Sequence, residues 1–136
     1  MSYQTDVAAL NRLIQLPAEP QKAYWQTYDK SDRGSELGPT DWELVAVLEY
    51  DVETIQNLQT QLIEQTHPAE LFVNPDFVKS WLPPAISDQF VEDARYSQLL
   101  KLNSQRYMPT PFTKAPLHTG YLFISDNLIF LFLHTQ

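Results

Sequence analysis

The sequence predicts an α+β fold: one two-layer domain with a mainly antiparallel sheet of about four strands and helices packed on one face. Three observations support this class. The 136 residues suit one domain with one core. A composition of 43% hydrophobic and 19% charged residues suits a packed interior. Segments with helical apolar spacing and segments with strand-like alternation follow each other along the chain. We therefore expect residues 1–136 to form a single domain.

The first predicted element is a helix of about three turns near the N-terminus. Val7, Leu10 and Ile14 recur there at helical spacing. Thr5 is a candidate N-cap for this helix, and Pro17 stops it.

Two strands separated by a long polar loop are predicted next. In residues 22–28, Tyr24 and Tyr28 share one face with a glutamine, which predicts partial exposure of both rings. Residues 29–41 contain two glycines and a proline, which is typical of a hairpin loop. Residues 42–50 alternate again and have a glutamate near each end of one face.

A second helix is predicted after Asp51. This residue can cap an apolar stripe that continues at helical spacing to Leu62, and the His-Pro pair at positions 67–68 ends the pattern. Asn74 then opens a short helix that runs through Trp81 and is stopped by two prolines. Another short helix is expected to begin near Ser87.

A basic stretch precedes the C-terminal segment. Residues 94–117 contain four basic and no acidic residues, whereas the whole chain has a net charge of −8. Three prolines after position 107 exclude a regular helix or a central strand and predict an ordered loop that carries aromatic rings.

The C-terminal segment is predicted to form a hairpin of residues 120–124 and 128–134. The second strand is apolar on both faces, which indicates an interior strand with helices on one side and more chain, or a second subunit, on the other. In a two-residue turn at positions 126–127, His118 and His134 lie on different faces. In a three-residue turn they lie opposite each other and could share a metal or a proton. No metal-ligand spacing accompanies them, so both stay catalytic candidates and no metal site is expected.

Composition and motifs exclude several classes of function. The charge of −8 argues against nucleic acid and anionic membranes as partners. The chain has no cysteine and no nucleotide-binding or hydrolase signature, so we expect no cofactor. The N-terminus does not resemble a signal peptide and no apolar run is long enough to span a membrane. These features predict a cytoplasmic protein, or a periplasmic one if a leader has been removed.

Six residues are candidates for binding a ligand or a partner. The two glutamates of residues 42–50 belong to an acidic group that suits a basic partner. An arginine and a tyrosine of the basic stretch combine a cation with a ring, as sites for anionic ligands do. The two tyrosines of residues 22–28 resemble a recognition surface. The candidates are Tyr24, Tyr28, Glu43, Glu49, Arg106 and Tyr107.

Two functions fit these features. The first is a non-catalytic binding protein, such as an inhibitor or immunity-like antagonist, whose acidic surface neutralises a basic protein partner. The apolar sheet faces also favour self-association through the sheet. The alternative is a small-molecule-binding protein or enzyme with a pocket between the sheet and the loop 95–116, where His118 is acid or base, Arg106 holds an anionic group and Tyr107 orients it. The missing catalytic and cofactor motifs favour the non-catalytic protein.

Overall fold

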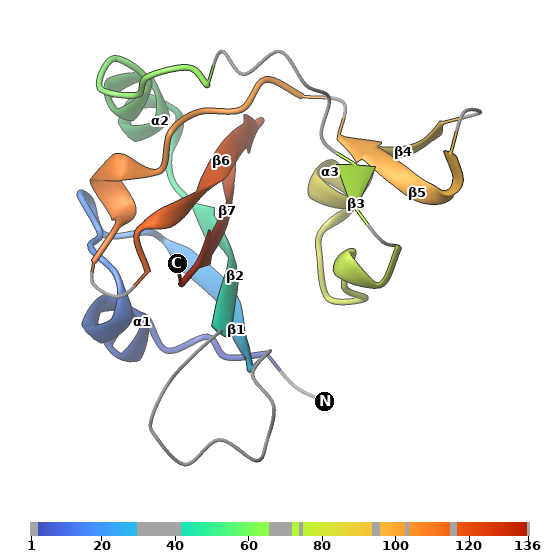
Figure 1. Cartoon of the computed structure of the whole chain (residues 1–136). Helices are drawn as coiled ribbons and strands as arrows, with labels where there is room; N and C mark the ends of the chain where they lie inside the picture. The colour runs from blue at the N-terminus through green and yellow to red at the C-terminus, as the bar shows by residue number, and fades with distance from the viewer. Residues whose placement is uncertain are drawn as a thin grey trace.

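The computed structural model describes residues 3–29, 42–65, 72–73, 75–93, 96–102, 104–114 and 117–135. Within these ranges the chain is a mixed α+β fold with mostly antiparallel strands, which confirms the predicted class (Figure 1). The larger sheet consists of β1 (Lys22–Asp29), β2 (Trp42–Glu49), β6 (Thr119–Ser125) and β7 (Leu128–His134). The smaller sheet consists of β3 (Phe72–Val73), β4 (Phe90–Asp93) and β5 (Tyr96–Leu102). The helices are α1 (Val7–Leu13), α2 (Val52–Gln59) and α3 (Pro84–Ser87), with the 3-10 turns η1 (Pro75–Phe77) and η2 (Thr110–Phe112).

β7 lies inside the larger sheet, as its apolar residues on both faces predict. The strand order is β1-β2-β7-β6, and every pairing in this sheet is antiparallel. Leu131 of β7 lies opposite Ala46 on one side and Leu122 on the other. Because successive side chains of a strand point to opposite faces, Leu131 and its neighbour Phe130 belong to two different layers of packing.

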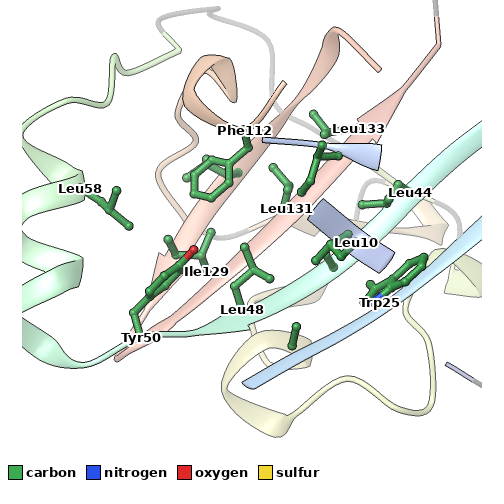
Figure 2. Packing of buried hydrophobic residues seen from close by; sticks show 14 of the residues in the cluster. Leu10, Trp25, Leu44, Leu48, Tyr50, Leu58, Phe112, Ile129, Leu131 and Leu133 are labelled. Carbon is green, nitrogen blue, oxygen red and sulfur yellow. The ribbon is translucent and has the colours of Figure 1, made fainter. Parts of the chain in front are cut away.

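Aliphatic side chains fill one side of the larger sheet, which we call the aliphatic face. Leu10 of α1, Leu58 of α2 and Phe112 of η2 pack there around Leu48 and Leu131 (Figure 2). All five side chains are buried, and removing one such side chain from water contributes about 1.5–3 kcal/mol to stability. The short helices are therefore held by this layer of packing more than by their own length.

Phenylalanine rings fill the opposite side, which we call the aromatic face. Phe123 and Phe130 stack with their ring centroids 5.0 Å apart. Phe90 of β4 meets Phe130 edge to face at 5.7 Å, and Phe77 of η1 meets Phe132 in the same way at 5.1 Å. The rings therefore join the larger sheet to the smaller one across the interior.

The elements that cover the aromatic face, α3, η1 and the smaller sheet, differ from the predicted fold in two respects. Ile86 of α3 packs in this aromatic cluster, so helices lie on both sides of the larger sheet and the prediction that they pack on one face only is wrong. The smaller sheet was not predicted. Of the two covers considered for the second side of β7, the structure contains more chain, which accounts for the apolar residues that suggested a partner there.

The boundaries of this cover also differ from the prediction. η1 is a single turn after Asn74 instead of a helix that reaches Trp81. The proline pair at positions 83–84 begins α3, with one proline at the first helical position, where its missing N–H leaves no bond unmade. Ser87 therefore ends a helix and does not begin one.

Capping residues explain where the two longer helices begin. The Asp6 carboxylate accepts a hydrogen bond from the N–H of Ala9 at 3.2 Å, so Asp6 and not Thr5 is the N-cap of α1. Asp51 accepts from the N–H of Thr54 at 2.8 Å and caps α2, as predicted. Across the described ranges, no helix has the length and apolar content needed to cross a membrane.

α2 ends at Gln59, earlier than the predicted stop at positions 67–68, which lies outside the described residues. Main-chain bonds to another segment explain the early end. The N–H of Met108 donates to the carbonyl of Ile63 at 2.7 Å, and the N–H of Gln65 donates to that of Arg106 at 3.0 Å. Tertiary pairing therefore overrides the apolar stripe that would otherwise continue the helix.

Both edges of the larger sheet carry a short extra pairing. Gln4 and Trp25 exchange two main-chain hydrogen bonds of 2.7 and 3.0 Å along β1. Tyr107 and Leu122 do the same along β6, at 2.8 and 3.1 Å. These bridges occupy donors and acceptors that an edge strand would otherwise present to other chains.

The C-terminal hairpin has a two-residue turn. Ser125 lies opposite Leu128, and Asp126 takes a positive φ of 56°, which aspartate tolerates. This register places His134 opposite Thr119, the first of the two arrangements considered. At the far end of β6, Gly120 has a φ of +152°, and a Cβ at this position would collide with the carbonyl oxygen of Phe132.

Candidate interaction surface

Three side chains of β1 point to the aromatic side of the larger sheet: Tyr24, Gln26 and Tyr28. β1 is the edge strand, so the cover reaches these residues only in part and both tyrosines are half-buried. Amphipathic rings at the rim of a core have an apolar body to pack and a polar tip that reaches water or a partner. This rim is where a recognition surface can form.

The side-chain oxygen of Gln26 holds two of the rings in place. It accepts a hydrogen bond from the hydroxyl of Tyr28 at 2.5 Å and another from the indole N–H of Trp81 at 3.1 Å. Trp81 lies in the segment just before α3. The two bonds therefore connect β1 to the cover of the aromatic face and restrict the orientation of both rings.

Tyr3 adds a third ring from the N-terminal segment. Its centroid lies 5.5 Å from that of Trp81 in a stacked arrangement and 5.7 Å from that of Tyr24 in an edge-on one. The bridge between Gln4 and Trp25 brings this segment onto β1. Tyr3 remains 42% exposed. We call Tyr3, Tyr24, Tyr28, Lys79 and Trp81 together the aromatic surface.

Two charges act on Tyr28. The Lys79 ammonium lies 4.3 Å from the ring centroid, within the range of a cation–π interaction, and Glu43 is the cross-strand neighbour of Tyr28. Partial burial raises the pKa of the Tyr28 hydroxyl and Glu43 raises it further, while the hydrogen bond from Trp81 acts in the opposite direction. At neutral pH the hydroxyl therefore stays protonated and can donate to Gln26.

The two histidines do not meet. His134 lies in one row with Glu43 and Thr119 across three strands, and its Nδ1 is 2.9 Å from the carbonyl oxygen of Thr135. His118 is exposed just before β6, where strand alternation assigns it to the opposite face. In the described ranges, no group of three His, Asp or Glu side chains could hold a metal ion.

The other predicted residues lie away from the aromatic surface. Glu49 is at the opposite end of β2 and accepts a 3.4 Å hydrogen bond from the side chain of Asn127. Tyr107 bridges the far edge of the sheet through its main chain, and Arg106 is the residue before it. Of the six candidates, the structure brings together Tyr24, Tyr28 and Glu43.

A cavity of about 570 Å³ lies beside the loop for which a pocket was predicted, on the aliphatic side. Pro111 and Lys114 of this loop line the cavity, and the other lining residues are Gln61 and residues of the α1 region. His118, Arg106 and Tyr107 are not among its lining residues. This cavity is therefore chemically different from the predicted one.

Tyr121 is the one buried polar side chain that lacks a hydrogen-bond partner in the described residues. Its ring lies on the aromatic face, and only 6% of the residue is exposed. Burial is the main cause that raises the pKa of its hydroxyl, with opposite and smaller effects from Arg106, which lowers it, and Glu43, which raises it. A buried hydroxyl without a partner costs stability.

No family model, curated protein or solved structure matches this chain significantly. The candidate surface therefore rests on its geometry. Sequence reasoning missed three of its members, Tyr3, Lys79 and Trp81. Their spacing carries no local signal, because the edge bridge and the Gln26 hydrogen bonds bring them to β1 from distant parts of the chain.

Proposed function

We propose that the protein is a non-catalytic binding protein that recognises a basic protein partner through the aromatic surface. The observation that supports this function is the convergence of Tyr3, Tyr24, Tyr28 and Trp81, from three separate segments, on one partly exposed patch. Tryptophan and tyrosine are enriched at the energetic centres of interfaces, because they bury a large area with few rotatable bonds. A patch of this kind is more typical of a protein-binding surface than of an active site.

The rings are ordered before any partner arrives. Gln26 fixes Tyr28 and Trp81 by hydrogen bonds, and Tyr3 stacks on the indole. A partner would therefore lose less side-chain entropy on binding than it would against mobile rings. Tyr3 provides the exposed contact area, while the others support it.

The net charge of the chain indicates that the partner is a basic protein. The net charge of −8 steers a basic protein toward the chain at low ionic strength. Lys79 already lies over Tyr28, so an incoming arginine would stack on Tyr3 or Trp81 instead. An acidic protein with accessible rings suits an inhibitor or antagonist of a basic protein.

The test compares the immobilised wild type with two variants, Tyr3→Ala and Met108→Ala. Met108 is 40% exposed and lies at the far edge of the sheet, so it matches Tyr3 in exposure. We expect a basic protein to be retained at low salt and released by high salt. Its affinity should fall about tenfold or more for Tyr3→Ala, as expected for an interface hot spot, and change less than twofold for Met108→Ala.

Circular dichroism of both variants shows whether the fold is kept. A basic protein retained equally by the wild type and Tyr3→Ala would contradict the proposal. Retention of a second copy of this chain in its place would also contradict it and would favour self-association.

A further inference from the structure

Two adjoining hollows run along α1 on the aliphatic side of the larger sheet, away from the aromatic surface. The first is the cavity of about 570 Å³ beside η2, and the second has a volume of about 330 Å³. Asn11 and Leu16 line both, so the hollows adjoin at these residues, and we call the two together the groove. Together they are within the size range of sites that bind small ligands and short peptides.

The floor of this groove is rigid. Ile14 in the floor is fully buried. The main-chain N–H of Gln15 donates to the carbonyl of Phe112 at 3.1 Å, and its side-chain amide donates to the carbonyl of Thr113 at 3.0 Å. The end of α1 and the η2 segment are therefore locked together, and the groove exists before a ligand binds.

Besides Gln15, four polar side chains line the groove, and they have no hydrogen-bond or ion-pair partner within the described residues. They are the amides of Asn11 and Gln61 and the charged groups of Lys114 and Glu19. An amide side chain has both a donor and an acceptor, the same pair that a peptide bond presents. The groove thus combines an apolar floor with groups that match an extended main chain.

The two charges lie in different hollows. Lys114 lines the larger one and Glu19 the smaller one. The residues of α1 and its C-terminal end that line the groove, from Val7 to Gln15, span roughly 12 Å at helical rise, and four extended residues span roughly 13 Å. A segment of four residues therefore matches the length of the groove wall that this stretch forms.

We propose that this groove binds a short extended peptide segment of a partner protein, with a carboxylate at Lys114 and a basic side chain at Glu19. The amides of Asn11 and Gln61 bond its main chain, and an apolar residue of the peptide packs on Leu16, which is half-buried and lines both hollows. This site is independent of the aromatic surface and does not rest on the function proposed for it.

The test uses ¹⁵N-labelled protein and three blocked tetrapeptides. Two carry Glu and Lys at opposite ends in the two possible orders, separated by Val-Thr, and the third replaces both charges by Gln. Chemical-shift titration gives each dissociation constant and the residues that respond. We expect one charged order to bind at least fivefold more tightly than the other two peptides, with shifts at Asn11, Gln15 and Gln61.

Charge reversal then separates a specific groove from general attraction. Lys114→Glu should weaken the preferred peptide about threefold to tenfold, whereas Lys22→Glu, the same change on exposed β1, should alter it less than twofold. The double variant Lys114→Glu with Glu19→Lys should prefer the opposite order. Equal binding of all three peptides, absence of binding at 10 mM, or an unchanged order preference in the double variant would overturn the proposal.

Discussion

The two faces of the larger sheet are buried in different ways. On β7, Ile129 and Leu131 pack among the aliphatic side chains beneath α1, α2 and η2, while Phe130 and Phe132 pack among rings from the smaller sheet and η1. Side chains from the short elements α1, α2 and η2 fill the aliphatic face, whereas edge-to-face ring contacts join the aromatic face to the smaller sheet and η1. The two faces of one sheet are thus stabilised by different kinds of contact.

The first and largest expected effect tests whether both faces are equally important. Phe130→Ala should lower the free energy of unfolding by about 4 kcal/mol, because it removes the ring that contacts Phe77, Phe90 and Phe123. Leu131→Ala, one residue away on the other face, should lower it by about 3 kcal/mol. Urea unfolding measures both. A loss below 1 kcal/mol for Phe130→Ala would mean that the smaller sheet contributes little to the stability of the chain.

Alkaline pH should weaken both faces through one buried tyrosine each. Burial raises the pKa of Tyr50 and Tyr121 above the ordinary value near 10. The folded chain therefore keeps these two protons at a pH where the unfolded chain releases them, and Tyr28, whose pKa is also raised, acts in the same direction. Above about pH 10, the free energy of unfolding should fall by about 1.4 kcal/mol per pH unit for each tyrosine. Urea unfolding between pH 8 and pH 11.5 checks this slope, and a stability that stays flat above pH 10 would contradict it.

Tyr50→Phe tests the satisfied hydroxyl at the aliphatic face. Tyr50 donates to the carbonyl oxygen of Ala18 at 2.8 Å, so the substitution leaves a carbonyl without its partner and should cost about 1 kcal/mol. The alkaline slope should decrease by about 1.4 kcal/mol per pH unit, since the contribution of Tyr50 is gone. An unchanged slope in the variant would show that Tyr50 ionises freely in the folded chain.

Tyr121→Phe provides the matching test at the aromatic face, with the smallest effect. Its hydroxyl has no partner in the described residues, so removal of this oxygen should leave the stability at pH 7 within about 0.5 kcal/mol of wild type or raise it. The alkaline slope should again decrease by about 1.4 kcal/mol per pH unit. A loss as large as that of Tyr50→Phe would show that the hydroxyl is hydrogen-bonded in solution.

The elements that the sequence predicted correctly are those with strong local signals. Alternation located β1 and β2, Asp51 marked the start of α2, and the Asp-Asn pair at positions 126–127 located the turn of the last hairpin. The register of that hairpin could not be chosen from sequence, because two turn lengths fit the same residues. The structure selects the shorter one.

The smaller sheet was missed because its strands are weak locally. β3 has two residues, and β5 lies in a basic stretch without regular alternation. Their pairing, Phe72 opposite Lys101 and Val73 opposite Leu100, joins distant segments and leaves no trace in a local window. The aromatic surface was half-predicted for the same reason. The alternation of β1 predicts the position of Tyr24 and Tyr28, whereas Trp81 is placed beside them by its hydrogen bond to Gln26, which no local pattern predicts.

The bridges at the two edges of the larger sheet have a consequence for how the protein behaves in concentrated solution. Gln4 forms hydrogen bonds with the main-chain N–H and carbonyl of Trp25, and Tyr107 does the same with Leu122. Strands as apolar as those of this sheet are prone to stack into fibrils when an edge is open. Loss of residues 1–5 would open β1, so a truncated form should nucleate amyloid-like assembly that the intact chain resists. The N-terminal segment therefore protects the protein against aggregation through the edge of β1, and it also contributes Tyr3 to the aromatic surface.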